Sequence, residues 1–236
     1  MSLFKGGKGE TIKKFYELDI NEREIGILYL GLSGLLLRTV NHVVLTDPSD
    51  LLGTDGLASL KNLDLVLYTH GHYDHFNLKH CLEICEKTNA AILAETTVYT
   101  GLKGKVAADR LYEAKVKEKL KVGEIMVTCI KGVHVGPITL YIIEMDGIKI
   151  FHGGDSGYIP LGEYSADIAF LPTGKPSPTA SPIDAFKMAS DLKPKVAIPI
   201  HGSPEQHRKF EEMIKKEKLG IDVKIVEEFE ALKLKV

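Results

Sequence analysis

The stretch Thr69-His70-Gly71-His72-Tyr73-Asp74-His75 guides the interpretation of the whole chain, and it directly follows a largely apolar run. His70 and His72 stand on either side of a glycine, so in an extended segment their imidazoles emerge on the same side. Asp74 and His75 can face a second centre once the chain turns. A solvated loop, or histidines capping the next helix, would be the simpler interpretation. Four candidate ligands within six residues at a strand end instead predict a metal site.

Three further residues farther along the chain follow predicted strands in the same way. They are His134 in Ile130-Lys-Gly-Val-His-Val-Gly-Pro, Asp155 in Phe151-His-Gly-Gly-Asp-Ser-Gly, and His201 in Ala197-Ile-Pro-Ile-His-Gly. Each alone is typical of a structural histidine or a turn. Together with the first cluster they complete a three-plus-three arrangement around one shared carboxylate. Nitrogen-rich shells of this kind suit borderline metals such as Zn²⁺, and an aspartate can bridge two ions.

The pattern of apolar runs predicts two similar halves, each a series of strands followed by helix-linked strands. The expected strands are Ile25–Gly31, Gly34–Thr39, Val43–Thr46, Leu63–Thr69, Ala91–Ala94, Ile125–Ile130, Thr139–Met145, Lys149–His152, Ile168–Leu171 and Val196–Ile200. Helices are expected at about Asn77–Lys87, after the Ser181-Pro182 start signal, and from Ser203 until Gly220. Two such halves predict an α/β fold with two facing sheets and helices outside, in four layers.

Length and composition describe an ordinary globular chain, expected to form a single domain over residues 1–236. Of the 236 residues, 44% are hydrophobic and 26% charged, and the formal net charge is −2. A near-neutral chain has no general attraction to nucleic acid, and no apolar run is long enough for a signal peptide or a membrane span. The three cysteines are too few for a disulfide scaffold, which favours a cytoplasmic location. Cys81 and Cys85 have the spacing of one helix face and are expected in the core.

The chain resembles the metallo-β-lactamase-fold superfamily over nearly its whole length. Within it, the resemblance is strongest to the metal-dependent hydrolases related to the ascorbate-6-phosphate lactonase. Besides the histidine cluster, the matching segments are Tyr29-Leu-Gly-Leu-Ser-Gly-Leu-Leu-Leu, Leu45-Thr-Asp-Pro, Phe151-His-Gly-Gly-Asp-Ser-Gly and Lys193-Pro-Lys-Val-Ala-Ile-Pro-Ile-His. The resemblance implies a four-layer αββα sandwich of two facing mixed sheets, with metals in a groove at one edge of the sheets.

The resemblance also implies a role for each ligand position. One metal would be held by His70, His72 and His134, and the other by Asp74, His75 and His201, with Asp155 bridging the two. Asp47 matches an early aspartate that supports the ligand loop from behind.

This site predicts a dinuclear metal-dependent hydrolase that acts on a small ester, lactone or phosphoester. A metal-bound hydroxide would attack carbon or phosphorus, and Asp74 would orient it and accept its proton. Zn²⁺ is the favoured metal, with Mn²⁺ and Fe²⁺ as alternatives. His152 is a further candidate at the edge of the site. Tyr73 and Tyr158 are candidate oxyanion donors, and Lys175 is a candidate partner for an anionic group.

Three other functions compete with this one. A phosphodiesterase or nuclease of the same superfamily is disfavoured, because the chain offers no arm for a polymer and the ligand loop continues as Phe76-Asn-Leu. A diiron oxidoreductase on this fold is disfavoured because that branch has a glutamate where this chain has His72. A non-catalytic relative is disfavoured because all seven ligand positions are filled. The expected partner is a small-molecule substrate, with no membrane, and a homo-oligomer stays open.

Overall fold

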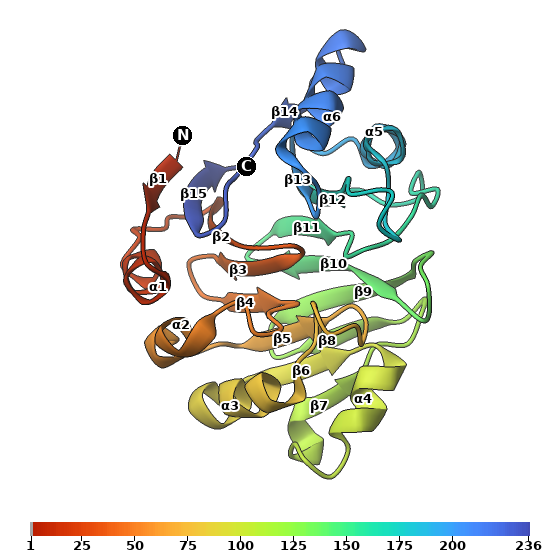
Figure 1. Ribbon diagram of the computed structural model, residues 1–236. Helices are drawn as coiled ribbons and strands as arrows, with labels where there is room; N and C mark the ends of the chain where they lie inside the picture. The colour runs from red at the N-terminus through yellow and green to blue at the C-terminus, as the bar shows by residue number, and fades with distance from the viewer. Residues whose placement is uncertain (1) are drawn as a thin grey trace.

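The computed structural model describes residues 2–236 and contains two β-sheets (Figure 1). The strands of the first sheet are Ser2–Lys5 (β1), Glu24–Gly31 (β2), Gly34–Arg38 (β3), Val43–Thr46 (β4), Leu65–Tyr68 (β5), Ala91–Ala94 (β6), Leu111–Glu113 (β7) and Glu230–Lys235 (β15). Their order is β1-β15-β2-β3-β4-β5-β6-β7. The two terminal strands pair with each other, so the chain ends lie on the same side of the molecule.

The second sheet has seven strands. They are Lys119–Val122 (β8), Ile125–Lys131 (β9), Thr139–Met145 (β10), Ile148–His152 (β11), Ile168–Pro172 (β12), Val196–Ile200 (β13) and Asp222–Val223 (β14). The order is β14-β13-β12-β11-β10-β9-β8, antiparallel from β8 to β11 and parallel from β11 to β14. Asp146 and Gly147 both have positive φ in the turn that joins β10 to β11, as a tight hairpin requires.

Helices cover the outer face of each sheet and so complete four layers (Figure 1). Apolar side chains of Lys8–Tyr16 (α1), Gly53–Ser59 (α2), Leu78–Thr88 (α3) and Thr96–Leu102 (α4) pack on the first sheet, and those of Pro182–Leu192 (α5) and Pro204–Lys216 (α6) on the second. A short 3-10 helix spans Ala108–Arg110. Within residues 2–236, no helix has the length and apolarity that a membrane crossing requires. The αββα sandwich expected from the sequence is confirmed.

The core follows from the alternation of side chains along the strands. In β2, Ile25, Ile27 and Tyr29 point into the space between the two sheets, while Leu28 and Leu30 point to the helices outside. Since side chains on a strand alternate between faces, a strand buried on both sides must be apolar throughout. Cys81 and Cys85 lie on the buried face of α3, as expected.

Some elements differ from the sequence prediction. The helix that begins after Ser203 ends at Lys216, four residues before Gly220, and the N–H of Glu217 donates to the Met213 carbonyl. The pattern also missed α1, and it missed α2 and α4. Helices α2 and α4 are seven residues long, with few apolar side chains, so packing on the sheet rather than local propensity stabilises them.

Candidate metal centre

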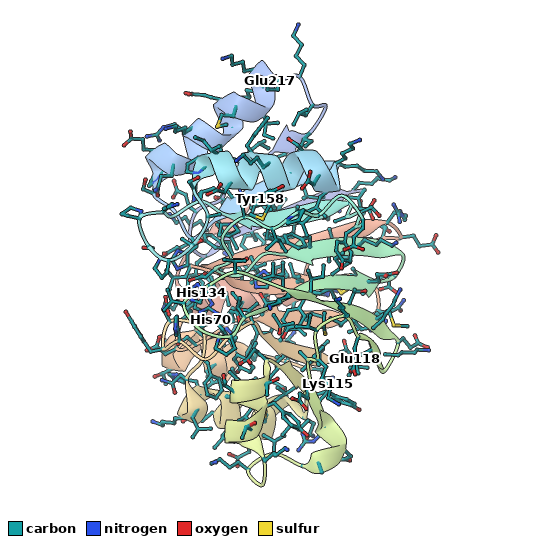
Figure 2. All side chains as sticks on the ribbon, turned by 90° about the vertical axis from the view of Figure 1, so that its right-hand side faces the viewer. His70, Lys115, Glu118, His134, Tyr158 and Glu217 are labelled. Carbon is teal, nitrogen blue, oxygen red and sulfur yellow. The ribbon has the colours of Figure 1, made fainter. Side chains whose placement is uncertain are left out.

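The predicted ligands lie in loops that follow the carboxyl ends of strands from both sheets. Because β4 runs parallel to β5, and β11 parallel to β12 and β13, these strand ends meet at one edge of the sandwich. The structure places Asp47 after β4, His70 to His75 after β5, His134 after β9, Asp155 after β11 and His201 after β13. Residues far apart in the sequence are thereby brought together, and His70 and His134, 64 positions apart, lie side by side in Figure 2.

The first group consists of His70, His72 and His134, whose candidate ligand atoms all lie within 4.8 Å of one another. His134 Nε2 is 3.1 Å from His72 Nδ1. The other ring nitrogen of His134, Nδ1, lies 2.6 Å from the carbonyl oxygen of Pro178. Since that carbonyl can only accept, Nδ1 carries the proton and Nε2 presents its lone pair to the group.

The tautomer of His70 follows from a short chain of hydrogen bonds. Thr69 Oγ1 donates to Asp47 Oδ2 at 2.7 Å, and it lies 3.0 Å from His70 Nδ1. Because the single hydroxyl proton of Thr69 is directed to Asp47, its oxygen accepts from His70 Nδ1. The lone pair of His70 therefore resides on Nε2, a buried atom with no hydrogen-bond partner among residues 2–236.

The second group consists of Asp74, His75, Asp155 and His201, again with candidate ligand atoms within 4.8 Å of one another. Asp155 Oδ2 lies 3.0 Å from both His75 Nε2 and His201 Nε2. Asp74 Oδ2 lies 3.7 Å from the same nitrogen of His75 and 3.8 Å from that of His201. These distances converge on one point between two imidazoles and two carboxylates.

The two groups are direct neighbours. The ring centroids of His70 and His75 are 4.1 Å apart, and those of His70 and His134 are 4.6 Å apart. The Nε2 atom of His70 is buried without a hydrogen-bond partner in the described chain, and the Nε2 atoms of His75 and His201 face the Asp155 carboxylate. Imidazole nitrogens and carboxylate oxygens that converge in this way are a ligand set that a divalent cation satisfies together. The residues present therefore fit a pair of metal ions.

Burial sets the protonation state of His70 and His134. It lowers the pKa of His70 to about 3, helped by the positive charge of His75 nearby. Burial also lowers the pKa of His134. Both imidazoles are therefore neutral at pH 7, which is the form that binds a metal.

The second group carries charge when it holds no metal. Burial by itself lowers the pKa of His75, but hydrogen bonds with Asp155 and Asp47 outweigh it and raise this pKa to about 10. The same balance, with Asp155 and Asp74 as partners, raises the pKa of His201 to about 9. Burial alone raises the pKa of Asp155, yet hydrogen bonds with His201 and His75 hold it well below its usual range. A metal ion must therefore displace protons from this group.

Asp47 lies beneath both groups and is fully buried. Its Oδ1 accepts from the backbone N–H of Thr69 at 2.8 Å, and its Oδ2 lies 3.0 Å from His152 Nε2 and 3.3 Å from His75 Nδ1. Burial raises the pKa of Asp47, but hydrogen bonds with His152 and His75 outweigh it and keep the pKa below its usual range. Asp47 thus fixes the orientation of the loop that carries His70 and His75, and His152 reaches the site through Asp47.

Three other predicted residues do not join the ligand groups. Tyr73 is 88% exposed, and its backbone carbonyl accepts from Ser49. Tyr158 is 39% exposed, and its hydroxyl lies 3.5 Å from Asp191 on α5. It lies apart from His70 and His134 in Figure 2. Lys175 is exposed, its backbone carbonyl accepts from the side chain of Gln206, and its N–H donates to the Ala180 carbonyl.

Sequence reasoning assigned no role to Ser33, which the structure places against the second group. Ser33 lies fully buried in the turn between β2 and β3, and its hydroxyl donates to Asp155 Oδ1 at 2.9 Å. The adjacent carbonyl of Leu32 accepts from the N–H of His201 at 3.0 Å. The available signal was the Gly-Leu-Ser-Gly turn itself, whose partners lie more than 120 residues away.

Known proteins resemble this chain in sequence and in structure. The family model of the beta-lactamase superfamily domain matches residues 26–201. A UPF0173 metal-dependent hydrolase of Methanopyrus kandleri is 30% identical over 185 residues, which are 69% of this chain and 78% of that protein. Igni18, a metallo hydrolase of Ignicoccus hospitalis, matches with a TM-score of 0.76 at 24% identity, covering 90% of this chain and 99% of that one.

The likeness in fold extends to more distant proteins. The metallo-beta-lactamase fold protein YhfI of Bacillus subtilis matches with a TM-score of 0.69 at 15% identity, covering 89% of this chain and all of that one. The matched span of the family model, residues 26–201, contains every residue of the two ligand groups. The chain therefore belongs to the beta-lactamase superfamily and, within it, to the same family of metal-dependent hydrolases as the Methanopyrus protein.

Proposed function

We propose that the protein is a dinuclear metal-dependent hydrolase of small esters, lactones or phosphoesters. One observation carries this proposal: two groups of ligand atoms lie side by side, with the ring centroids of His70 and His75 only 4.1 Å apart. The first metal is assigned to His70, His72 and His134, and the second to Asp74, His75 and His201. Asp155 is assigned as the bridge.

Two divalent ions in these positions supply an activated water and polarise the bond under attack. In the hydrolysis, the water oxygen bonds to the acyl carbon or phosphorus, the ester bond breaks, and the leaving alcohol takes up a proton. Asp74 is the carboxylate suited to hold a proton during this exchange. Its side chain is 26% exposed, whereas that of Asp155 is 5% exposed. The imidazole of His201 beside it lowers the pKa of Asp74, so Asp74 is ionised at neutral pH.

The chemistry of the ligands favours Zn²⁺, because the first group offers only imidazole nitrogens. Mn²⁺ and Fe²⁺ also accept a mixed nitrogen and carboxylate shell. We assign the protein to the cytoplasm, which the three free buried cysteines support. A small-molecule substrate is favoured over nucleic acid because the formal net charge is −2.

The test begins with the metal content of the purified protein, measured with and without chelator. The wild-type protein is expected to bind two ions, and the His70→Ala/His72→Ala double variant is expected to keep only the second. His80→Ala on α3 is the matched control, since this histidine belongs to neither ligand group. Equal metal binding by the double variant and the control would overturn the assignment of the first site.

A substrate panel then tests the reaction. The metal-loaded protein is offered an aryl ester, a γ-lactone, a phosphodiester, a β-lactam and a single-stranded oligonucleotide. We expect chelator-sensitive hydrolysis of at least one of the first three and none of the oligonucleotide. Cleavage of the oligonucleotide alone would replace this proposal with a nuclease, and a metal-loaded protein inactive on every compound would contradict hydrolysis.

A further inference from the structure

A cavity of about 450 Å³ opens beside the first ligand group, and His134 forms part of its wall. A second contact ties it to the ligand loop: Thr97 also lines the cavity, and a Cβ placed on Gly71 would lie 3.4 Å from Thr97 Oγ1. Cavities of this size are typical of sites for small molecules. A molecule in the cavity is thus held next to His134 and the loop of His70 and His72.

The walls of the cavity are largely aliphatic. They are formed by Ala114, Val116, Val133, Pro137 and Ile138. Val116 is 38% exposed and Val133 58%, although large apolar side chains are normally covered. Apolar surface around a hollow gains free energy when it is covered by the hydrocarbon part of a ligand.

Lys131 supplies the cation of this cavity. It lies at the end of β9, three residues before His134, and is exposed. No ion pair joins Lys131 to any residue within 2–236, so its charge is available to a ligand. Glu95 also lines the cavity, but it is 3% exposed and its carboxylate accepts from the N–H and hydroxyl of Thr97. Lys131 is therefore the charge that an incoming molecule meets.

We propose that this cavity binds the acyl part of the substrate, and that the substrate is an ester or lactone whose short aliphatic acyl chain ends in a carboxylate that pairs with Lys131. The aliphatic walls cover the chain, and the scissile bond lies toward His134. The proposal rests on the hydrolase function proposed above and adds the substrate class. Lys131 determines specificity and takes no part in bond cleavage.

The experiment compares two esters that differ only at the far end of the acyl chain. p-Nitrophenyl valerate ends in a methyl group, and mono-p-nitrophenyl glutarate carries a carboxylate in its place. We expect the wild-type protein to prefer the glutarate in kcat/KM. Lys131→Met keeps the aliphatic stem but removes the charge, so it should lower kcat/KM for the glutarate about 5- to 50-fold, mainly through KM, and leave the valerate within about twofold.

Lys121→Met is the matched control, because Lys121 is an exposed lysine on β8 of the same sheet that lines no part of this cavity. This variant should leave kcat/KM for both esters unchanged. If Lys131→Met and Lys121→Met lowered kcat/KM for the glutarate equally, the effect would be a general one of charge and the proposal would be overturned. An equal fall in kcat/KM for both esters in Lys131→Met alone would also overturn the proposal, because recognition of the carboxylate predicts an effect on the glutarate only.

Binding is measured separately with amides that are not cleaved, so that the cavity is tested even without turnover. Isothermal titration compares glutaranilic acid with valeranilide. Glutaranilic acid should bind the wild-type protein at least fivefold more tightly than Lys131→Met, and Val133→Trp, which fills the cavity, should weaken both amides. Absence of turnover with this binding pattern would contradict the proposed function but support the cavity. Turnover with equal binding of glutaranilic acid by wild type and Lys131→Met would refute the cavity proposal alone.

Discussion

The hydroxyl of Ser33 donates to Asp155 Oδ1 at 2.9 Å and thereby joins a turn of the first sheet to a metal-site loop of the second. Asp155 Oδ2 is left to face His75 and His201, each at 3.0 Å. The hydrogen bond thus decides which carboxylate oxygen is presented to the second group.

Removal of this hydroxyl should weaken metal binding at the second group more than at the first. Partners that orient a ligand typically contribute 10- to 100-fold in metal affinity, so we expect a loss of about that size in Ser33→Ala. Metal titration with analysis of the ions retained after dialysis measures it. Ser190→Ala on α5, which removes a hydroxyl bonded within its own helix, is the control. Equal retention of both ions by the two variants would exclude a positioning role for Ser33.

Asp47→Asn should affect stability as well as metal binding. An amide has one acceptor oxygen, whereas Asp47 accepts from the backbone N–H and the hydroxyl of Thr69 and also faces His152 and His75. The loss of a buried charge from this network should lower the free energy of unfolding by about 2–4 kcal/mol. Urea unfolding in the presence of chelator measures this change in the free energy of unfolding without bound metal.

The control for that substitution is Asp50→Asn, which changes an exposed aspartate three residues away. It should stay within about 0.5 kcal/mol of the wild-type protein. If Asp47→Asn unfolds at the same urea concentration as Asp50→Asn, the network around Asp47 does not stabilise the fold.

Gly174→Ala should disturb His201 through the backbone. A Cβ on Gly174 would lie 2.0 Å from the carbonyl oxygen of His201, far inside contact distance, so one of the two segments must move. We expect loss of the second metal and a stability loss of about 1–3 kcal/mol, typical of overpacking. Gly162→Ala is the control because its Cβ would meet nothing within 4 Å. Full retention of both ions by Gly174→Ala would contradict this tight packing.

His207 should make the protein less stable in acid. It is 5% exposed on α6, and burial lowers its pKa to about 4 from the ordinary value of 6.5. The unfolded chain binds the proton more readily, so this contribution is complete above pH 6.5 and is lost as the pH falls toward 4. Between pH 7.5 and 5, it should remove roughly 1–2 kcal/mol of stability.

The measurement compares the pH dependence of urea unfolding in wild type and His207→Gln. The variant cannot titrate, so its stability should fall less between the two pH values. The difference between the proteins isolates His207 from the metal-site histidines, which titrate in both. Identical pH profiles would show that His207 is not protonated more readily in the unfolded chain.

Local sequence could indicate where the candidate ligands lie, because strand ends and ligand spacing are both visible in short segments. The cluster from His70 to His75 and the strand-end positions of Asp155 and His201 lie where the pattern of apolar runs placed them. The positions of the candidate substrate-binding side chains could not be predicted in the same way. Tyr158 follows the loop of Asp155 in sequence, but its hydroxyl lies near Asp191 on α5, which no short-range pattern reports.

Contacts between the two sheets could not be predicted from the sequence. The pairing of Ser33 with Asp155 depends on how the sheets pack, and so does the cavity beside His134. His207 is buried because α6 turns this side of the helix inward, which the local sequence around it does not indicate. Each of these features depends on the tertiary arrangement.

Each ligand group takes residues from both sheets, and this has a thermodynamic consequence. His70 and His72 come from the first sheet and His134 from the second, while Asp74 and His75 face Asp155 and His201 in the same way. An ion bound to either group links residues of the two sheets, and it can stay bound only while the sheets are packed together. By mass action, metal concentration and resistance to unfolding must rise together. Availability of the ion in the cell would thus set the lifetime of the folded chain as well as its turnover.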